Sequence, residues 1–434
     1  MISNRKAGDF TMMWILGLFC VFLLGIPIAF SLGIVSVVGL IGTQLPLQVV
    51  VQQMYGGVSN FAFIAIPLFI LAGNLMAVGG ISRRITDFSE SVVGHFAGGL
   101  GLVVIVSSMI FAAVTGSAIA AAAAIGALLI PPMVERGYSK EYAASLVATS
   151  GSIGPIIPPS IPLVIYGVIV SCSIAKLFIG GVIPGLLMGI SLMIANILIS
   201  KKRGYIGHTQ KASAKEIFQG FKDAILALIM PIIIVGGIVG GVFTPTESAA
   251  IAVAYALVLG ALIYRELTWA SVRKAFMDAA ITNGIILTVL MTARLFIWFM
   301  TVKMIPQSVA QSLLEYITTP WMALMVMNII LLIAGTFIDT TSAITIFVPL
   351  FLPLVKAFNI DLIHFGLVVA VNLSIGMCTP PLGVCLFVTC GIANTSLREM
   401  FHDLVLLLIP LLIVLLMITY MPWLITFLPN YLGL

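Results

Sequence analysis

Charged residues are scarce in this chain of 434 residues: Lys, Arg, Asp and Glu make up 8% of it. An ordinary soluble domain contains about 25% charged residues. Hydrophobic residues make up 61% of the chain, which is more apolar surface than a soluble domain could bury. About ten apolar runs are long enough to cross a hydrocarbon core of about 30 Å. The composition therefore predicts an all-α polytopic membrane protein whose solvent is largely the lipid bilayer.

The sequence also lacks the motifs of several functional classes. It contains neither HExxH nor GxxxxGK[ST], the signatures of a zinc protease and of an ATP-binding P-loop. Its five cysteines lie in apolar surroundings without metal-ligand spacing, which is typical of small buried residues. The net charge of +5 fits basic loops that set orientation in a membrane. We therefore expect no enzymatic activity, no organic cofactor and no binding of nucleic acid.

The two halves of the chain resemble each other. Ser152–Ser160 reads SIGPIIPPS, and Ser374–Leu382, 222 residues later, reads SIGMCTPPL. Each copy follows another interrupted apolar segment, so we interpret the pair as an internal repeat. The predicted units are repeat one at 1–200, a basic cytoplasmic loop at 201–223 and repeat two at 224–434.

Each repeat is predicted to contain five full crossings and one re-entrant hairpin, which enters and leaves on the same side. An odd number of crossings forces the two repeats into opposite orientations. The predicted segments of repeat one are 12–26, 28–44, 61–80, a hairpin at 98–132, a broken helix at 143–170 and 177–200. Those of repeat two are 224–243, 247–264, 277–301, a hairpin at 321–354, a broken helix at 363–391 and 404–428.

The basic residues agree with this topology. The central loop carries six Lys or Arg against two acids, so the positive-inside rule places it in the cytoplasm. Fourteen basic residues then fall on the cytoplasmic side and five on the other. A tight turn at Pro27 predicts an extracytoplasmic N-terminus. Arg5 and Lys6 would reach the cytoplasm instead if residues 12–42 formed one helix.

Helix-breaking residues occur at membrane depth in both repeats. A proline in a helix interior costs about 3 kcal/mol, so the Gly and paired Pro of each SIGxxxPP segment should unwind its helix. Unwound carbonyl groups in hydrocarbon need a partner, which a bound cation supplies. The N-termini of the half-helices nearby would favour an anionic substrate. The alternative interpretation is a kink that only shapes packing.

Three single residues remain open to two or more interpretations. Asp339 is the only acid inside the second hairpin, and it is either functional or a cap of the helix that follows. Arg294 is the only basic residue deep within a span. It could pair with Asp339, contact a substrate carboxylate or extend to the membrane interface. Ser160 could face substrate or bond to its own helix.

Six segments, in order along the chain, carry a family resemblance. They are FAFIAIPLFILAGNLM at Phe61–Met76, TGSA at Thr115–Ala118, IGPIIPPSIPLVIYG at Ile153–Gly167, GVFTPTESAAIAVAYALVLG at Gly241–Gly260, TFIDTTSAITIFVPLFLP at Thr336–Pro353 and IGMCTPPLGVCLFV at Ile375–Val388. Together they resemble the large membrane subunit of TRAP (tripartite ATP-independent periplasmic) transporters.

The resemblance implies a sodium-coupled importer in the bacterial inner membrane with an elevator-type movement. Its substrate would be an organic anion, such as sialic acid or a C4-dicarboxylate. Its partners would be a periplasmic substrate-binding protein and a small four-helix membrane subunit. A stand-alone sodium/carboxylate symporter of the related inverted-repeat fold is the alternative, and a channel or a membrane enzyme is less favoured.

The resemblance also implies sites for two or more Na⁺ ions and for substrate. Sodium site one would use Ala112, Gly154, Ile157 and Pro159; sodium site two would use Gly335, Gly376, Thr379, Leu382 and Cys385; substrate would contact Ser117, Ser160, Asp339, Thr340 and Arg294. The chain departs from the family pattern twice. Asn74 stands where many relatives have Glu, and Ile157 is the repeat partner of Thr379, so the two ion sites are expected to differ chemically.

Overall fold

The computed structural model describes residues 24–41, 46–205, 207 and 211–434, together with residues 14, 17, 18 and 20–22. Helices and their connecting loops form all of this part, which contains no β-strand, and nine of its helices are long and apolar enough to cross a membrane. The predicted all-α polytopic fold is confirmed. The predicted span at 12–26 lies partly outside the described residues. Arg5 and Lys6 lie wholly outside them.

The first half of the chain contains the following helices. They are α2 (Ile28–Leu40), α3 (Gln48–Gly56), the 3-10 helix η1 (Phe61–Ile64), α4 (Ala65–Val78), α5 (Ile81–Val93), α6 (Gly99–Thr115), α7 (Ala118–Glu135), α8 (Lys140–Gly151), α9 (Ile161–Val170) and α10 (Ile174–Arg203). The second half contains α11 (Ala214–Val239), α12 (Pro245–Val258), the π-helix η2 (Leu259–Ile263), α13 (Trp269–Val302), α14 (Ile305–Leu314), α15 (Pro320–Phe337), α16 (Thr340–Ala357), α17 (Leu362–Gly376), α18 (Val384–Ala393), α19 (Leu397–Tyr420) and α20 (Trp423–Tyr431).

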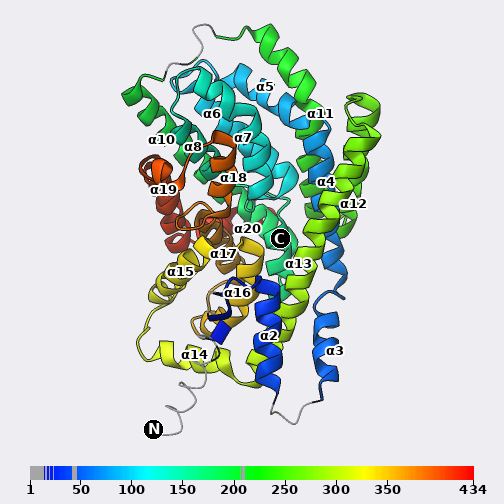
Figure 1. The fold of residues 1–434 in the computed structure, drawn as a ribbon, viewed down its shortest axis with the longest axis vertical. Helices are drawn as coiled ribbons and strands as arrows, with labels where there is room; N and C mark the ends of the chain where they lie inside the picture. Colours follow the sequence, from blue (N-terminus) through cyan, green and yellow to red (C-terminus); the bar gives the residue numbers. More distant parts are fainter. Residues whose placement is uncertain are drawn as a thin grey trace.

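Helices α6 to α9 correspond to helices α15 to α18. The offset of 222 residues that relates the two SIGxxxPP segments also separates both ends of α7 from both ends of α16. Figure 1 draws the hairpin of α6 and α7 in the upper half of the molecule and the hairpin of α15 and α16 in the lower half. The chain therefore consists of two inverted repeats, each with a helical hairpin.

Each hairpin is followed by an interrupted helix. Residues 152–160 separate α8 from α9, and residues 377–383 separate α17 from α18. Both breaks contain the paired prolines, whose Pro158–Pro159 and Pro380–Pro381 bonds are cis. Proline lacks the backbone donor that a continuous helix needs, so the sequence itself ends the helices here.

The central segment is more helical than the predicted loop at 201–223. Helix α10 continues to Arg203. Ser213 and Glu216 then form a capping box, in which each side chain accepts the other residue's backbone N–H, and α11 begins directly after Ser213. Helices α3, α5 and α14 were also not predicted as separate elements. Each is short, and the apolar runs beside them gave the stronger signal.

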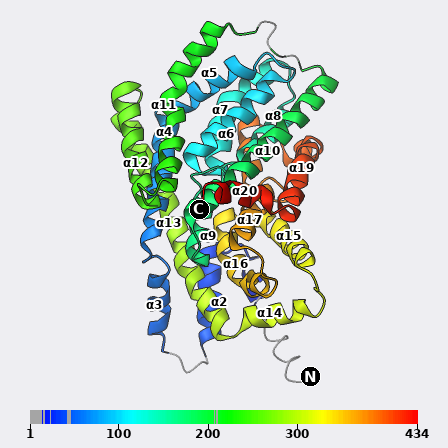
Figure 2. The same cartoon turned by 180° about the vertical axis from the view of Figure 1, so that it is seen from behind.

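Most of the helices form two groups, which Figures 1 and 2 show from opposite sides. In the first group, α4 packs against α12 and α13, and α2 and α3 pack along α13. In the second group, α7, α8 and α18 pack together, and α15 packs on α17. We call α2, α3, α4, α11, α12 and α13 the framework, and α6 to α9 with α15 to α18 the hairpin body. The two groups meet where α4 contacts α6 and α9, and where α13 contacts α16.

Buried amide side chains hold each hairpin in place. In repeat one, Tyr142 Oη donates to Asn196 Oδ1 at 2.8 Å, and the Asn196 amide donates to the N-cap carbonyl of α6. In repeat two, Asn372 Nδ2 donates to Asn328 Oδ1, and Asn328 Nδ2 donates to Thr419 Oγ1, both at 2.9 Å. A buried polar group left unpaired costs about 1–3 kcal/mol. These bonds therefore fix the position from which each hairpin reaches the centre.

Candidate functional site

Each hairpin turns at a polar residue that caps its second helix. Ser117 Oγ accepts a hydrogen bond from the backbone N–H of Ala120 at 3.4 Å. At the matching position of repeat two, the Asp339 carboxylate accepts from the Ser342 backbone N–H at 3.1 Å and from the Ser342 hydroxyl at 2.6 Å. Both residues satisfy donors at a helix start that would otherwise lack a partner. Asp339 therefore caps helix α16, as one of its two interpretations from the sequence proposed.

The tip of the first hairpin lies directly against the first helix break. A methyl group added at Gly154 would lie 2.8 Å from the Ser117 carbonyl oxygen. One added at Gly116, whose φ is +61°, would lie 2.4 Å from the Pro159 carbonyl oxygen. Only glycine permits such an approach of two backbones. The contact gathers carbonyl oxygens from two separate segments.

The second hairpin meets the second break in the same way. A methyl group added at Gly376 would lie 2.6 Å from the Cα atom of Gly335. Beyond the break, the Gly383 backbone N–H donates to the Thr336 carbonyl, and the Cys385 backbone N–H donates to the Met377 carbonyl, both at 3.1 Å. The two repeats thus build two similar backbone contacts out of glycine.

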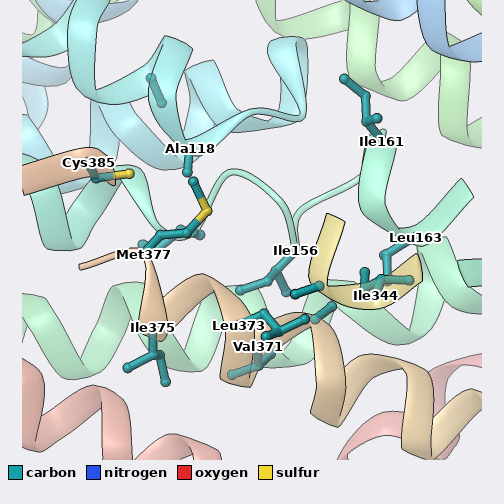
Figure 3. Packing of buried hydrophobic residues seen from close by; sticks show 14 of the residues in the cluster. Ala118, Ile156, Ile161, Leu163, Ile344, Val371, Leu373, Ile375, Met377 and Cys385 are labelled. Carbon is teal, nitrogen blue, oxygen red and sulfur yellow. The ribbon is translucent and has the colours of Figure 1, made fainter. Parts of the chain in front are cut away.

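The hairpin tips and the breaks surround a cavity of about 460 Å³. Its walls include the first residues of α7, α9 and α16, so three helix N-termini open onto it. Met377 of the second break lines this cavity together with Ala118 and Ile161 of repeat one, and Figure 3 shows these three side chains with the packed core below them. Both repeats therefore contribute to a single site.

The electrostatics of this cavity come mainly from the backbone. Each helix N-terminus carries about half a positive elementary charge. Asp339 is the only ionisable side chain among the described residues that line the cavity. Its negative charge offsets part of the positive charge of the three helix starts. An anion with further polar groups would find backbone dipoles, hydroxyl groups and one carboxylate here.

The framework supplies the opposite wall of the cavity, and this wall is mostly apolar. It consists of Ile70, Gly73 and Asn74 of α4, and Thr282, Ile285, Ile286 and Val289 of α13. The Asn74 side chain donates to the Ala275 carbonyl at 3.3 Å. The Thr282 hydroxyl donates to the Asp278 carbonyl at 2.9 Å. Sequence reasoning placed α13 at the site only through Arg294, and it did not place Asn74 there, although it singled out Asn74 as unusual.

The residues predicted for sodium site one gather at the first tip and break, with one exception. The Ala112 carbonyl accepts the Gly116 N–H at 2.8 Å, and Gly154 and Pro159 lie at the contacts described above. Ile157 instead directs its side chain toward α10, where a methyl group at Gly185 would lie 2.4 Å from it. Any role of residue 157 at the tip would therefore fall to its backbone.

The residues predicted for sodium site two lie around the second break. Gly335 and Gly376 are in contact, and the Thr379 hydroxyl donates to the Ile375 carbonyl at 2.9 Å. Cys385 is buried, whereas the Leu382 side chain is 43% exposed. Leu382 occupies the position of Ser160 in repeat one and cannot cap a helix, and α18 accordingly begins after Gly383 without a side-chain cap.

Three of the five predicted substrate residues line the cavity: Ser117, Asp339 and Thr340. Ser160 is buried behind the wall. Its hydroxyl caps α9 and donates to the Pro155 carbonyl, as in the second interpretation of this residue. Arg294 lines a different cavity and is not among the residues that line the central cavity with Asp339. Asp339 and Arg294 therefore occupy separate cavities.

The layout defines a class of protein. Inverted repeats whose interrupted helices meet around a cavity are the architecture of secondary transporters. Residues 15–424 match the family model described as "Tripartite ATP-independent periplasmic transporter, DctM component". The chain belongs to this family, the large permeases of TRAP transporters, and the predicted resemblance is confirmed.

Three curated relatives show how far the similarity extends. The sialic acid large permease SiaM of Vibrio cholerae is 40% identical over 94% of this chain and 96% of its own length. The C4-dicarboxylate large permease DctM of Rhodobacter capsulatus is 35% identical over 96% and 98%. The isethionate permease DctMQ of Oleidesulfovibrio alaskensis is 41% identical over 94% of this chain. The chain spans 64% of the length of that protein.

A solved structure shares the fold at low sequence identity. The crystal structure of the YdaH transporter of Alcanivorax borkumensis superposes with a TM-score of 0.58 over 89% of both chains, at 13% identity. At this identity the likeness concerns the fold alone. It agrees with the arrangement of helices described above.

Proposed function

We propose that this chain is the translocating subunit of a sodium-coupled importer of an organic anion. It works in the bacterial inner membrane with a small four-helix membrane subunit and a periplasmic substrate-binding protein. The substrate is a carboxylate such as sialic acid or a C4-dicarboxylate.

One observation carries this proposal: three helix N-termini converge on a cavity formed by both inverted repeats. Backbone N–H groups at helix starts favour an anion without any cationic side chain. The named relatives fit this chemistry, because sialic acid, C4-dicarboxylates and isethionate are all anions. The few hydroxyl groups of the cavity suit many such substrates.

Sodium coupling is supported by the two glycine contacts behind the tips. Unwound backbone carbonyls at interrupted helices are the groups that coordinate Na⁺ in transporters of this architecture. Gly154 and Gly376 each keep a tip and a break within backbone contact. An ion bound there would join the two segments and complete the cavity wall that faces substrate.

An elevator-type movement is supported by the division of the helices. The hairpin body carries both tips and both breaks, while the framework contributes one mostly apolar wall. A rigid hairpin body could therefore move along the framework with substrate and ions still bound, as in domain movements of the shear type.

The first prediction concerns the energy source. Purified protein reconstituted with its small subunit and binding protein should take up substrate only under an inward sodium gradient. Equal uptake in potassium or choline buffer at the same pH would contradict the proposal. A second arm omits the binding protein. Full uptake without it would favour the stand-alone symporter.

A further inference from the structure

A second cavity, of about 780 Å³, lies between the framework and the hairpin body. Helix α13 lines one side of it, and α9 and α16 line the other, with the start of α14 between them. We call it the outer chamber. Its lining residues include Asn60, Ser171, Arg294, Thr301, Gln307 and Lys356.

The outer chamber is basic. Arg294 and Lys356 are its only ionisable residues within the described part of the chain, and no acid lines it. Both side chains are exposed, and neither forms an ion pair with another described residue. Two unpaired cations within one hollow raise the local concentration of anions, because low-dielectric walls focus the field.

The outer chamber continues the path of the central cavity. Along α13, the central cavity ends at Val289 and the chamber begins at Leu290. At 1.5 Å per residue, Arg294 lies only about 7.5 Å further along the helix axis than Val289. Helix α16 likewise runs from the central cavity at Thr340 to the chamber at Lys356. Helices α13 and α16 therefore line both the central cavity and the outer chamber.

The chamber faces the end of the molecule opposite to the basic central segment. Its walls include the start of α14 and the turn after α3, and Figures 1 and 2 draw α3 and α14 at the end remote from α5 and the start of α11. With the central segment in the cytoplasm, the chamber opens toward the side from which substrate arrives.

The base of Arg294 is fixed by close packing. A methyl group added at Gly57 would lie 2.8 Å from Arg294 Cβ, so the turn after α3 presses directly on this point of α13. Lys356 lies in the last turn of α16, where a cation also stabilises the helix C-terminus. Helix stabilisation alone predicts no effect of Lys356 on anions in the chamber. An experiment can therefore separate helix stabilisation from anion binding.

We propose that Arg294 and Lys356 form an outer subsite that holds the carboxylate or sulfonate group of an incoming anion before it reaches the central cavity. The identity of that anion as the transported substrate rests on the proposed function. The positive potential of the chamber does not depend on the proposed function, and the rate of thiol modification measures this potential directly.

The potential can be read from thiol reactivity. Thr301 lines the chamber and is exposed, so Thr301→Cys places a thiol there, in a background where Cys20, Cys172 and Cys390 are replaced by serine. In detergent, an anionic thiosulfonate should modify this thiol about tenfold faster than a cationic one, after correction for their rates with free thiol. Arg294→Gln combined with Lys356→Gln should remove the preference, and succinate or N-acetylneuraminate should slow modification only when both cations are present.

A matched position controls for general effects. Thr282→Cys places a thiol in the central cavity on the same helix, about 18 Å from Arg294 along the axis, well beyond a Debye length of about 8–10 Å. Its charge preference should not change when the two cations are neutralised. Equal rates for both reagents in the Thr301→Cys variant, or a preference that survives double neutralisation, would overturn the subsite.

Uptake links the subsite to transport. In proteoliposomes that show sodium-driven uptake with the wild-type protein, Arg294→Gln with Lys356→Gln should raise KM about tenfold with little change in maximal rate. Lys176→Gln, on the same side but in neither cavity, should behave as wild type. If more binding protein restores uptake by the double variant, and the charge preference of the Thr301→Cys thiol survives double neutralisation, these residues form a protein-docking surface. That outcome would overturn the subsite. Absence of wild-type uptake would count against the proposed function alone.

Discussion

Asp339→Asn is expected to lower sodium-driven uptake by about tenfold to a hundredfold and to leave thermal stability close to that of the wild-type protein. A hydrogen bond or ion contact to a charged group contributes about 1.5–3 kcal/mol, which sets this range. The carboxylate has about four acceptor positions, of which Ser342 occupies two. The remaining positions are available to a hydroxyl group or a cation in the cavity.

Asparagine separates charge from capping at this position. Asparagine and aspartate are about equally good N-caps, so the variant keeps the bonds that start α16 while it loses the negative charge. Asp361→Asn is the matched control, because Asp361 caps α17 by accepting from the His364 N–H at 2.7 Å and lines neither cavity. Both variants should unfold at nearly the wild-type temperature. Wild-type uptake by Asp339→Asn would make this residue a cap and nothing more.

Gly376→Ala is expected to abolish uptake and to remove part of the stabilisation that sodium confers on the purified protein. The added methyl group would lie 2.6 Å from Gly335 Cα, so the tip and the break must separate. Overpacking of this kind costs about 1–3 kcal/mol of stability. A ligand that binds only the folded state raises its stability by mass action, so loss of one ion site should shrink the sodium-dependent rise in Tm measured from each variant's own baseline.

The chain offers a control and a symmetry test for this prediction. Gly391 lies inside α18 with no atom near its missing side chain, so Gly391→Ala should be neutral or slightly stabilising. Gly154→Ala should act like Gly376→Ala, because its methyl group would meet the Ser117 backbone at 2.8 Å. Sodium titrations that match wild type in both break variants would leave only helix kinks at these positions.

The sequence predicted the hairpins and breaks because their causes are local. Paired prolines alone do not end a helix, since Pro131 and Pro132 lie inside α7. The combination of a glycine and paired prolines in SIGxxxPP marks both breaks, and its repetition identified the two sites without any knowledge of packing. The capping contacts of Ser117 and Asp339 follow equally local rules, since a polar side chain at a helix start accepts from the next turn.

Features that depend on tertiary packing were less accessible to sequence reasoning. Arg294 is a deep basic residue in sequence, but only the rotation of α13 decides that it faces the outer chamber and not Asp339. Ser160 follows the paired prolines directly, yet its backbone geometry turns the hydroxyl inward to the Pro155 carbonyl. Asn74 faces the central cavity because α4 packs against the first hairpin, a contact between elements about 40 residues apart in sequence.

The apolar framework wall has a consequence for the speed of any movement along it. Each hydrogen bond that had to break before the two groups of helices could slide would raise the activation barrier by up to about 1.5 kcal/mol, or about tenfold in rate. Ile285, Ile286 and Val289 offer no such bonds to a ligand, and the Asn74 amide and Thr282 hydroxyl already donate to their own framework. A ligand in the cavity therefore has few hydrogen bonds to this wall that must break, since among the described residues of the wall only Asn74 and Thr282 keep unused polar positions there. Its polar contacts to the hairpin tips move with the hairpin body.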